Sequence, residues 1–252
     1  MRLFGISAVI LLSVVDLGWS QVDVGSSQTA TLPMYRPILL GTGPDALINR
    51  IDTADLVRKG QKDAAIMFSC SVKKDGSVLS ASTYRGTPDS KLLEQEVLKR
   101  LSVASNPKFI PGVYNHLPED GIYYGTVTFM LVNGKPRLRI FSNQERDELA
   151  KENDFVGPQP FWGGDSGFTG FHYPSSNTAP VQLDGSAEVE VKVDANGNLQ
   201  DMSVLSEEPP FLGFGETAFS DLAKAKFIPA FRNGKPVACD VKLPVYFNPK
   251  SF

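Results

Sequence analysis

The tetrapeptide Lys-Phe-Ile-Pro occurs twice in the chain, at residues 108–111 and again at residues 226–229. Each copy follows an alternating apolar pattern, a tight-turn signal and a stretch with apolar residues at helical spacing. Self-similarity of this kind is the sequence signature of a repeated supersecondary unit. The sequence therefore predicts one small α+β unit in tandem, with each Phe-Ile pair filling a core and each proline stopping a helix.

The second copy of the unit has the clearer pattern. Residues 188–193 alternate charged and β-branched side chains at period two, which is typical of a half-buried strand. Asn196-Gly197 favours a tight hairpin with positive φ angles, and a returning strand follows over residues 199–205. Residues 216–226 have helical spacing, and residues 237–247 carry apolar side chains at odd positions. The unit is therefore predicted to run strand, strand, helix, strand.

The first copy has the same order. Residues 53–59 predict a short helix that Gly60 stops, and strands follow at residues 67–72 and 78–84. A helix through residues 93–101 is next, with Thr87-Pro88 predicted as its N-cap and first helical residue.

The two copies differ at their ends. After a third strand over residues 126–131, the first copy continues through Asn133-Gly134 into a fourth strand over residues 137–141, which would cover one sheet edge. The last strand of the second copy contains Pro244 on its outward face. Proline has no N–H donor and is found in sheets mainly on edge strands. The C-terminal strand is therefore predicted to be an open edge.

The predicted fold class is α+β, with two tandem small domains, each an antiparallel three- to four-stranded sheet packed on a helix. Ser142 and Glu145 suggest a capping box for a helix that reaches about Lys151. The predicted divisions are a signal peptide at 1–20, an N-terminal extension at 21–50, a first domain at 51–141, a helix and Gly/aromatic connector at 142–172, and a second domain at 173–252.

The N-terminal segment has the pattern of a secretory signal. Arg2 precedes an apolar run over residues 3–15, and Gly18 and Ser20 frame a cleavage site before Gln21. The run is shorter than the roughly 20 residues that cross a bilayer core of about 30 Å. We expect a periplasmic or secreted product without a membrane span in the mature chain; cleavage and retention of the segment as an anchor both stay open.

Composition and charge exclude some partners. Hydrophobic residues make up 42% of the chain, and 25 basic against 28 acidic residues give a net charge of −3 without any basic block. A nucleic acid would meet no concentrated positive field, so it is not an expected partner.

Residues that could carry chemistry are few and scattered. The two histidines, His116 and His172, lie in loop-like stretches without a second nitrogen ligand at metal spacing. The acidic pairs Glu119-Asp120 and Glu207-Glu208 lie beside turn signals, where solvated charges are expected. We therefore expect no catalytic residue, no metal and no cofactor.

Cys70 and Cys239 both fall on inward faces of predicted strands, one in each copy. Each therefore has the pattern of a small apolar core residue. A free, buried pair is favoured, and a disulfide in an exported protein stays open as the alternative.

The connector is rich in aromatic residues among glycines. These side chains could form a binding loop with rigid contact area, or they could wedge between the two domains. The wedge is the favoured interpretation. The residues are Phe161, Trp162, Phe168, Phe171 and Tyr173.

The second copy resembles the C-terminal domain of the TonB family of envelope proteins, and the first copy is similar but degraded. The first copy keeps Gly60, Asp75-Gly76 and Phe109-Ile110-Pro111. The residues of the second copy that carry the resemblance are Tyr173-Pro174, Gly185, Val189, Val191, Val193, Asp194, Gly197, residues 227–230, residues 233–237 and residues 243–247.

The resemblance implies a small sheet packed on a helix that makes protein–protein contacts in the cell envelope, where a partner peptide adds a strand to the sheet edge. We expect an exported, non-enzymatic binding module for an extended peptide or a protein, such as an outer-membrane or other envelope protein. An energy transducer is not expected, since the chain has no functional membrane helix and no long proline-rich spacer. The alternative is a structural envelope protein that pairs edge to edge as a homodimer. The predicted partner-binding residues are Val237, Cys239, Val241, Leu243, Val245 and Phe247.

Overall fold

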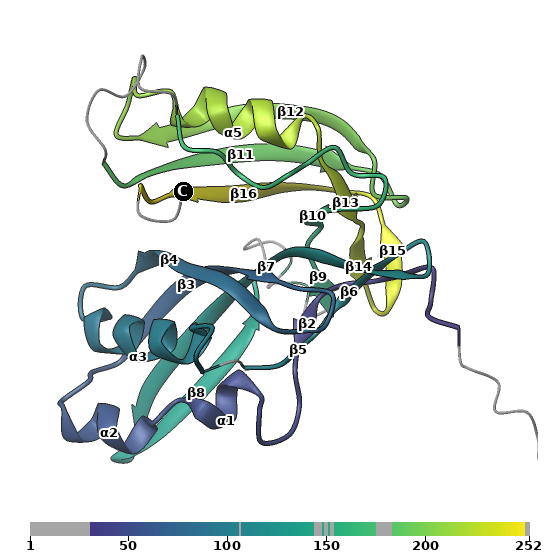
Figure 1. The fold of residues 1–252 in the computed structure, drawn as a ribbon. Coiled ribbons are helices and arrows are strands. Elements are labelled where there is room, and N and C mark those ends of the chain that lie inside the picture. Colours follow the sequence, from purple (N-terminus) through teal and green to yellow (C-terminus); the bar gives the residue numbers. More distant parts are fainter. Residues whose placement is uncertain are drawn as a thin grey trace, which may run out of the picture. The chain divides into compact units, whose positions relative to one another are not determined.

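The computed structural model describes residues 31–105, 107–143, 148, 151, 154–174 and 183–249. Residues 32–252 form one compact unit, shown in Figure 1. The predicted signal peptide lies outside the described residues, as does most of the helix predicted after Ser142, including Glu145. Among the helices that the structure describes, none is long and apolar enough to cross a membrane.

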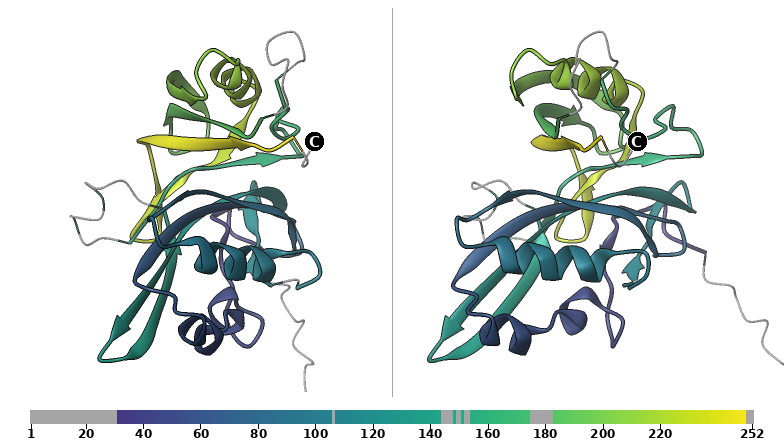
Figure 2. Two further views of the ribbon diagram at one scale, coloured as in Figure 1. Left: turned by 90° about the vertical axis from the view of Figure 1, so that its left-hand side faces the viewer. Right: turned by 60° about the vertical axis from the view of Figure 1, so that its left-hand side comes forward.

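The first half contains an antiparallel sheet whose central strands run in the order β4-β3-β7-β8. Helix α3 lies along one face of this sheet (Figure 2), and its buried Leu93, Val97 and Leu101 pack on the core side of β3. The predicted fourth strand is present as β8 and pairs with β7. The elements are α1 (Leu47–Arg50), α2 (Thr53–Arg58), β3 (Ala64–Val72), β4 (Val78–Gly86), α3 (Lys91–Leu101), β7 (Leu117–Val132) and β8 (Lys135–Ser142).

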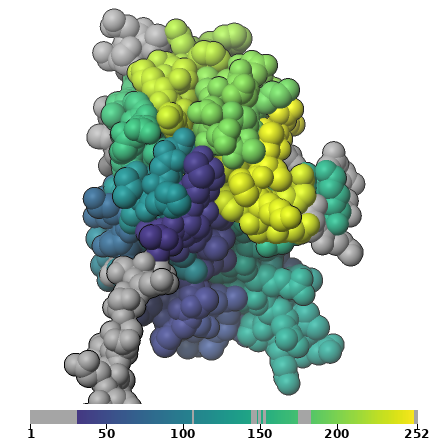
Figure 3. Space-filling view, turned by 90° about the vertical axis from the view of Figure 1, so that its right-hand side faces the viewer, coloured from purple at the N-terminus to yellow at the C-terminus, as the bar shows by residue number. Residues whose placement is uncertain are grey.

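The N-terminal segment contributes two short strands. β1 (Tyr35–Arg36) pairs with β6 (Gly112–Tyr114), and β2 (Leu39–Leu40) pairs with β5 (Phe109–Ile110). Figure 3 shows this segment in purple beside the C-terminal hairpin in yellow. Residues 32–50 are therefore part of the folded unit.

The second half contains a three-stranded antiparallel sheet in the order β12-β11-β16, with α5 packed on it. The valines of β11 alternate inward, as their period-two spacing predicts, because α5 covers only one face of the sheet. The elements are β11 (Gly185–Val193), β12 (Leu199–Glu208), α5 (Phe214–Leu222), β13 (Lys226–Ile228), β14 (Ala230–Arg232), β15 (Lys235–Val237) and β16 (Cys239–Phe247). The α+β class is confirmed.

The connector forms two strands that the sequence pattern did not reveal. β9 (Phe155–Val156) pairs with β14. β10 (Gln159–Trp162) pairs with β7 on one side and with β13 on the other. The connector is therefore part of the sheet that joins the two halves.

The repeated tetrapeptide has the same structural role in both halves. The N–H of Phe109 donates to the carbonyl of Gly76 at 2.9 Å, and the N–H of Phe227 donates to that of Gly197 at the same distance. Both glycines lie at the tip of a strand–strand turn, with φ angles of +79° and +82°. Each Lys-Phe-Ile segment therefore docks on a hairpin tip, although duplication of one ancestral unit stays a prediction.

Three details of the predicted elements were wrong. The second helix ends at Leu222 and not at Lys226, whereas the first ends at Leu101 as predicted. The proline of each Lys-Phe-Ile-Pro copy separates two strands, as between β13 and β14, and does not stop a helix. Thr87 does not cap α3, because its side-chain oxygen accepts from the N–H of Ala65; Ser90 is the N-cap residue. Only Gly197 of the predicted Asn196-Gly197 pair has a positive φ angle.

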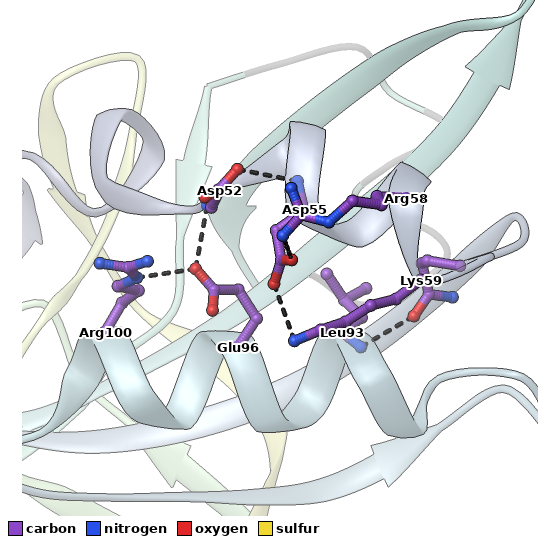
Figure 4. A network of polar contacts seen from close by, with 8 residues as sticks. Asp52, Asp55, Arg58, Lys59, Leu93, Glu96 and Arg100 are labelled. Atoms are coloured by element: carbon purple, nitrogen blue, oxygen red, sulfur yellow. Dashed lines mark hydrogen bonds and ion pairs between the residues drawn. The ribbon is translucent and has the colours of Figure 1, made fainter.

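A polar network joins α2 to α3 (Figure 4). The carboxylate of Glu96 on α3 accepts from the N–H of Asp52 at 2.9 Å and from the guanidinium of Arg100 at 2.7 Å. Asp52 in turn caps α2 by accepting from the N–H of Asp55 at 2.9 Å. Glu96 is buried, so these bonds satisfy a charge that would otherwise be costly to desolvate.

Candidate functional site

The C-terminal strand β16 is an edge strand of the second sheet. Among the described strands it pairs with β11 alone, so its other side carries backbone groups without a strand partner. Its odd-numbered side chains point into the core under α5; Val241 is 7% exposed and Leu243 is 5% exposed. The strand therefore offers its backbone, and the side chains predicted to bind a partner are largely used by the protein's own core.

The position of Pro244 sets the phase of this free edge. Pro244 stands opposite Glu188 and has no N–H to donate to β11. Residues along an antiparallel strand alternate between directing N–H and C=O at one neighbour and directing them away. Asp240 and Tyr246 share the phase of Pro244, so we expect their N–H groups to point away from β11.

The free edge runs along three hollows. A cavity of 330 Å³ is bordered by Pro244, Tyr246 and Asn248, and one of 50 Å³ by Lys242 and Pro244. A further hollow of 400 Å³ borders the strand from residue 238 to residue 242. Strands β3, β4 and β7 supply the opposite wall of the 330 Å³ cavity, through residues such as Tyr124 and Ser82.

Val237 lies outside this strand. It belongs to β15, which pairs with β14 through Val237 and Ala230, whereas β16 begins at Cys239 and pairs with β11. The alternation of odd apolar residues continues through both strands, which is why the sequence predicted a single strand over residues 237–247. Val245 and Phe247 are buried in the second hydrophobic cluster, beside Leu243.

The two cysteines are free thiols. Cys70 is buried on the core face of β3, and burial raises the pKa of its thiol. Cys239 is half-buried, and burial together with the neighbouring Asp240 raises the pKa of its thiol to about 12. Both groups are therefore protonated at neutral pH and poor nucleophiles.

The histidines make separate local contacts. Nδ1 of His116 lies 2.7 Å from the carbonyl oxygen of Leu32, and Nδ1 of His172 lies 2.9 Å from a carboxylate oxygen of Asp221. Among the described residues, no group of three or more His, Cys, Asp or Glu side chains could hold a metal ion.

The acidic pairs lie in strands and not in loops: Glu119-Asp120 in β7 and Glu207-Glu208 at the end of β12. Asp120 accepts from the N–H of Lys74 at 2.6 Å, while burial and then the charge of Asp120 raise the pKa of Glu119. Glu207 accepts from the N–H groups of Leu212 and Gly215 at the start of α5. One carboxylate of each pair therefore holds a backbone segment in place.

The connector aromatics pack between the two halves. Phe161 is buried in the first hydrophobic cluster, and Phe168 is buried in the second. The other three, Trp162, Phe171 and Tyr173, are partly buried against the second cluster. This placement agrees with the wedge interpretation. Trp162 and Phe171 also border the 330 Å³ cavity.

Sequence reasoning missed the serines that line this cavity. Ser69 and Ser71 on β3 stand opposite Ser82 and Ser80 on β4. Their alternate spacing along two strands was a detectable signal, but nothing in the sequence indicated that the connector and β16 would lie over them.

The fold and this edge together define a class: a small α+β module whose C-terminal strand has one neighbouring strand in its sheet, among the strands that the structure describes. Residues 171–249 match the family model described as Gram-negative bacterial TonB protein C-terminal, so this segment resembles a TonB C-terminal domain. That family is a periplasmic, non-enzymatic protein-interaction domain. No curated protein and no solved structure matches the chain.

Proposed function

We propose that this protein is an exported, non-enzymatic module of the cell envelope that recruits an extended peptide segment of a protein partner along β16. The observation that carries the proposal is the outer edge of β16, which pairs with β11 alone among the described strands, in the segment that matches the TonB C-terminal family. Unpaired backbone groups can bind an added strand irrespective of most of its side chains.

The hollows beside β16 support the same mode. They follow the strand from residue 238 to residue 248, which is where an added strand would lie. Successive side chains of the added strand would point to the sheet face covered by α5 and to the opposite face in turn. Every second residue of the partner would therefore contact the same face, and these residues would determine specificity. A segment of an outer-membrane or other envelope protein in extended conformation is the expected partner.

The test is an NMR titration of the ¹⁵N-labelled protein with extended peptides of roughly six residues, a typical strand length. We expect saturable shifts of the Asp240 and Tyr246 amides. Asp240→Pro removes one outward N–H and should lower affinity by about tenfold, since a lost backbone hydrogen bond and a misfitting ring act together. Asp240→Ala removes the same side chain, keeps the N–H, and should bind as the unchanged protein does.

Proline at 240 is a sharper probe than proline at 241. Val241 is buried and opposite Val191, so a proline there would disturb the protein's own pairing with β11. Peptide-induced shifts that avoid β16, or equal affinities for Asp240→Pro and Asp240→Ala, would refute recruitment along this edge.

Self-association is the competing use of the same edge. Two copies of β16 could pair antiparallel about a two-fold axis, which would hide the edge without any external ligand. Light scattering over a wide concentration range distinguishes the two: a dimer that Asp240→Pro dissociates supports self-pairing, and a concentration-independent monomer excludes it.

A further inference from the structure

The 330 Å³ cavity has two chemically different walls. One wall is the outward face of the first sheet, where Ser69 pairs with Ser82 and Ser71 pairs with Ser80 across β3 and β4. The hydroxyls of Ser69 and Ser82 lie 3.3 Å apart. The size is within the range of small-molecule sites, about 300–1,000 Å³.

The opposite wall is aromatic, and two of its rings pack against a buried phenylalanine. Trp162 and Phe171 come from the connector, and Tyr246 comes from β16. The buried ring of Phe168 lies 6.5 Å from Trp162 and 5.1 Å from Phe171, in tilted and edge-on geometry. Rings held this way keep a fixed orientation, so they present pre-ordered contact area.

Charge is missing from the cavity lining. None of the described residues that border it is Asp, Glu, Lys, Arg or His. The matching rows of the second sheet are charged: Glu190 stands opposite Ser203, and Lys192 stands opposite Asp201. The serine rows are therefore a specific property of this face, and a phosphate, carboxylate or ammonium ligand would find no counter-charge here.

We propose that this cavity binds a neutral saccharide of one or two rings. A pyranose has hydroxyls around its rim, which can exchange hydrogen bonds with serine hydroxyls that both donate and accept. Its faces carry C–H groups with partial positive charge, which are attracted to the negative faces of aromatic rings. Serines on one wall and packed aromatic rings on the other match these two features. Among the residues of β16, Pro244 and Tyr246 border this cavity, so it meets one end of the proposed strand-addition edge and not Asp240 at the other end.

The test is an NMR titration of the labelled protein with cellobiose and with N,N′-diacetylchitobiose. At least one of these neutral disaccharides should give saturable shifts at the Trp162 indole N–H and at Ser71 and Ser80. Glucuronic acid and glucosamine, which carry a charge, should bind at least about fivefold more weakly than neutral glucose.

Paired variants locate the site. Ser71→Ala combined with Ser80→Ala should lower saccharide affinity at least about fivefold, because two hydroxyl partners are lost. The control, Ser203→Ala combined with Ser206→Ala on the exposed strand β12, should leave affinity unchanged. Asp240→Pro, outside the cavity lining, should also leave it unchanged, so failure of peptide recruitment and failure of this proposal can be told apart.

Three outcomes would overturn the proposal: no saturable shift with either disaccharide, equal loss of affinity in the two serine pairs, or shifts confined to the Asp240 and Tyr246 amides as expected for a peptide.

Discussion

At the scale of single residues, the hairpin-tip glycines explain the repeated tetrapeptide. A Cβ atom built at Gly197 would lie 1.8 Å from the carbonyl oxygen of Phe227, and one at Gly76 would lie 2.2 Å from that of Phe109. Neither position tolerates a side chain, because the contact is with backbone that is itself hydrogen-bonded to the same turn.

Gly197→Ala is expected to lower the free energy of unfolding by at least about 2 kcal/mol, since left-handed backbone alone costs roughly 1–2 kcal/mol for a side-chain residue and the clash adds to it. Gly234→Ala is the matched control: Gly234 has a φ of +73° but open space around its Cβ position, so only the backbone cost of about 1 kcal/mol applies. Urea unfolding of both variants measures the difference. Equal losses would mean that the Phe227 contact contributes nothing.

At Tyr124 we expect a substitution that does not lower the stability of the protein. Its hydroxyl is buried and has no hydrogen-bond partner among the residues that the structure describes. Burial raises the pKa of this phenol, which therefore stays protonated and leaves a donor unused. Tyr124→Phe should be neutral or should stabilise the protein by up to about 1 kcal/mol.

Tyr84→Phe is the control for Tyr124→Phe, because the hydroxyl of Tyr84 accepts from the side-chain amide of Asn143. Its loss leaves that amide without this acceptor and should cost about 1 kcal/mol. Thermal or urea unfolding gives both values; a clear loss of stability in Tyr124→Phe would contradict the structure at this hydroxyl.

At the scale of elements, long periodic segments were predictable and short ones were not. The alternation over residues 188–193 located β11 because one face of that strand is buried and the other faces solvent. β10 was missed because its four residues include a proline and are buried on both faces, so no alternation marks it. The strand forms because β7 and β13 both hydrogen-bond to it. These strands are far away in the sequence, so no local pattern could predict the pairing.

The end of the second helix was misplaced for a related reason. The apolar spacing of residues 216–226 continues through Ala225, but the chain leaves the helix after Leu222 to pair β13 with β10. The N-cap residue of α5 is Gly213, which has no side chain to cap the helix. The carboxylate of Glu207, six residues earlier, accepts from the N–H of Gly215 instead, and the sequence pattern gave no sign of this contact.

Glu207→Ala is therefore expected to cost about 1–2 kcal/mol, the usual range for losing a helix N-cap. Its carboxylate accepts from the N–H groups of Leu212 and Gly215, at 3.0 Å and 2.6 Å. Glu208→Ala removes an exposed neighbouring carboxylate and should change stability by less than about 0.5 kcal/mol. Urea unfolding and amide exchange in the first turn of α5 check the pair; similar losses in both variants would show that the cap is not what Glu207 contributes.

At the scale of the whole molecule, the two halves share their cores. The first hydrophobic cluster includes Ile228 and Phe231 from the second half, and the second cluster includes Ile122 and Tyr124 from the first. Strand β10 is hydrogen-bonded to both halves. The sequence pattern predicted two separate cores because each half has its own amphipathic strands and helix, whereas the sharing depends on contacts between residues far apart in the chain.

This sharing predicts cooperative unfolding of residues 32–252. Leu101 on α3 and Leu222 on α5 are both fully buried, one in each cluster, and either Leu→Ala substitution should cost about 2–5 kcal/mol. If the halves unfold together, each substitution lowers the protection of the slowest-exchanging amides in β3 and in β11 by the same amount. Native-state hydrogen exchange measures both strands in one experiment. Loss confined to β3 for Leu101→Ala and to β11 for Leu222→Ala would instead establish two independently stable domains, and strand recruitment at β16 could then proceed without any response from the first half.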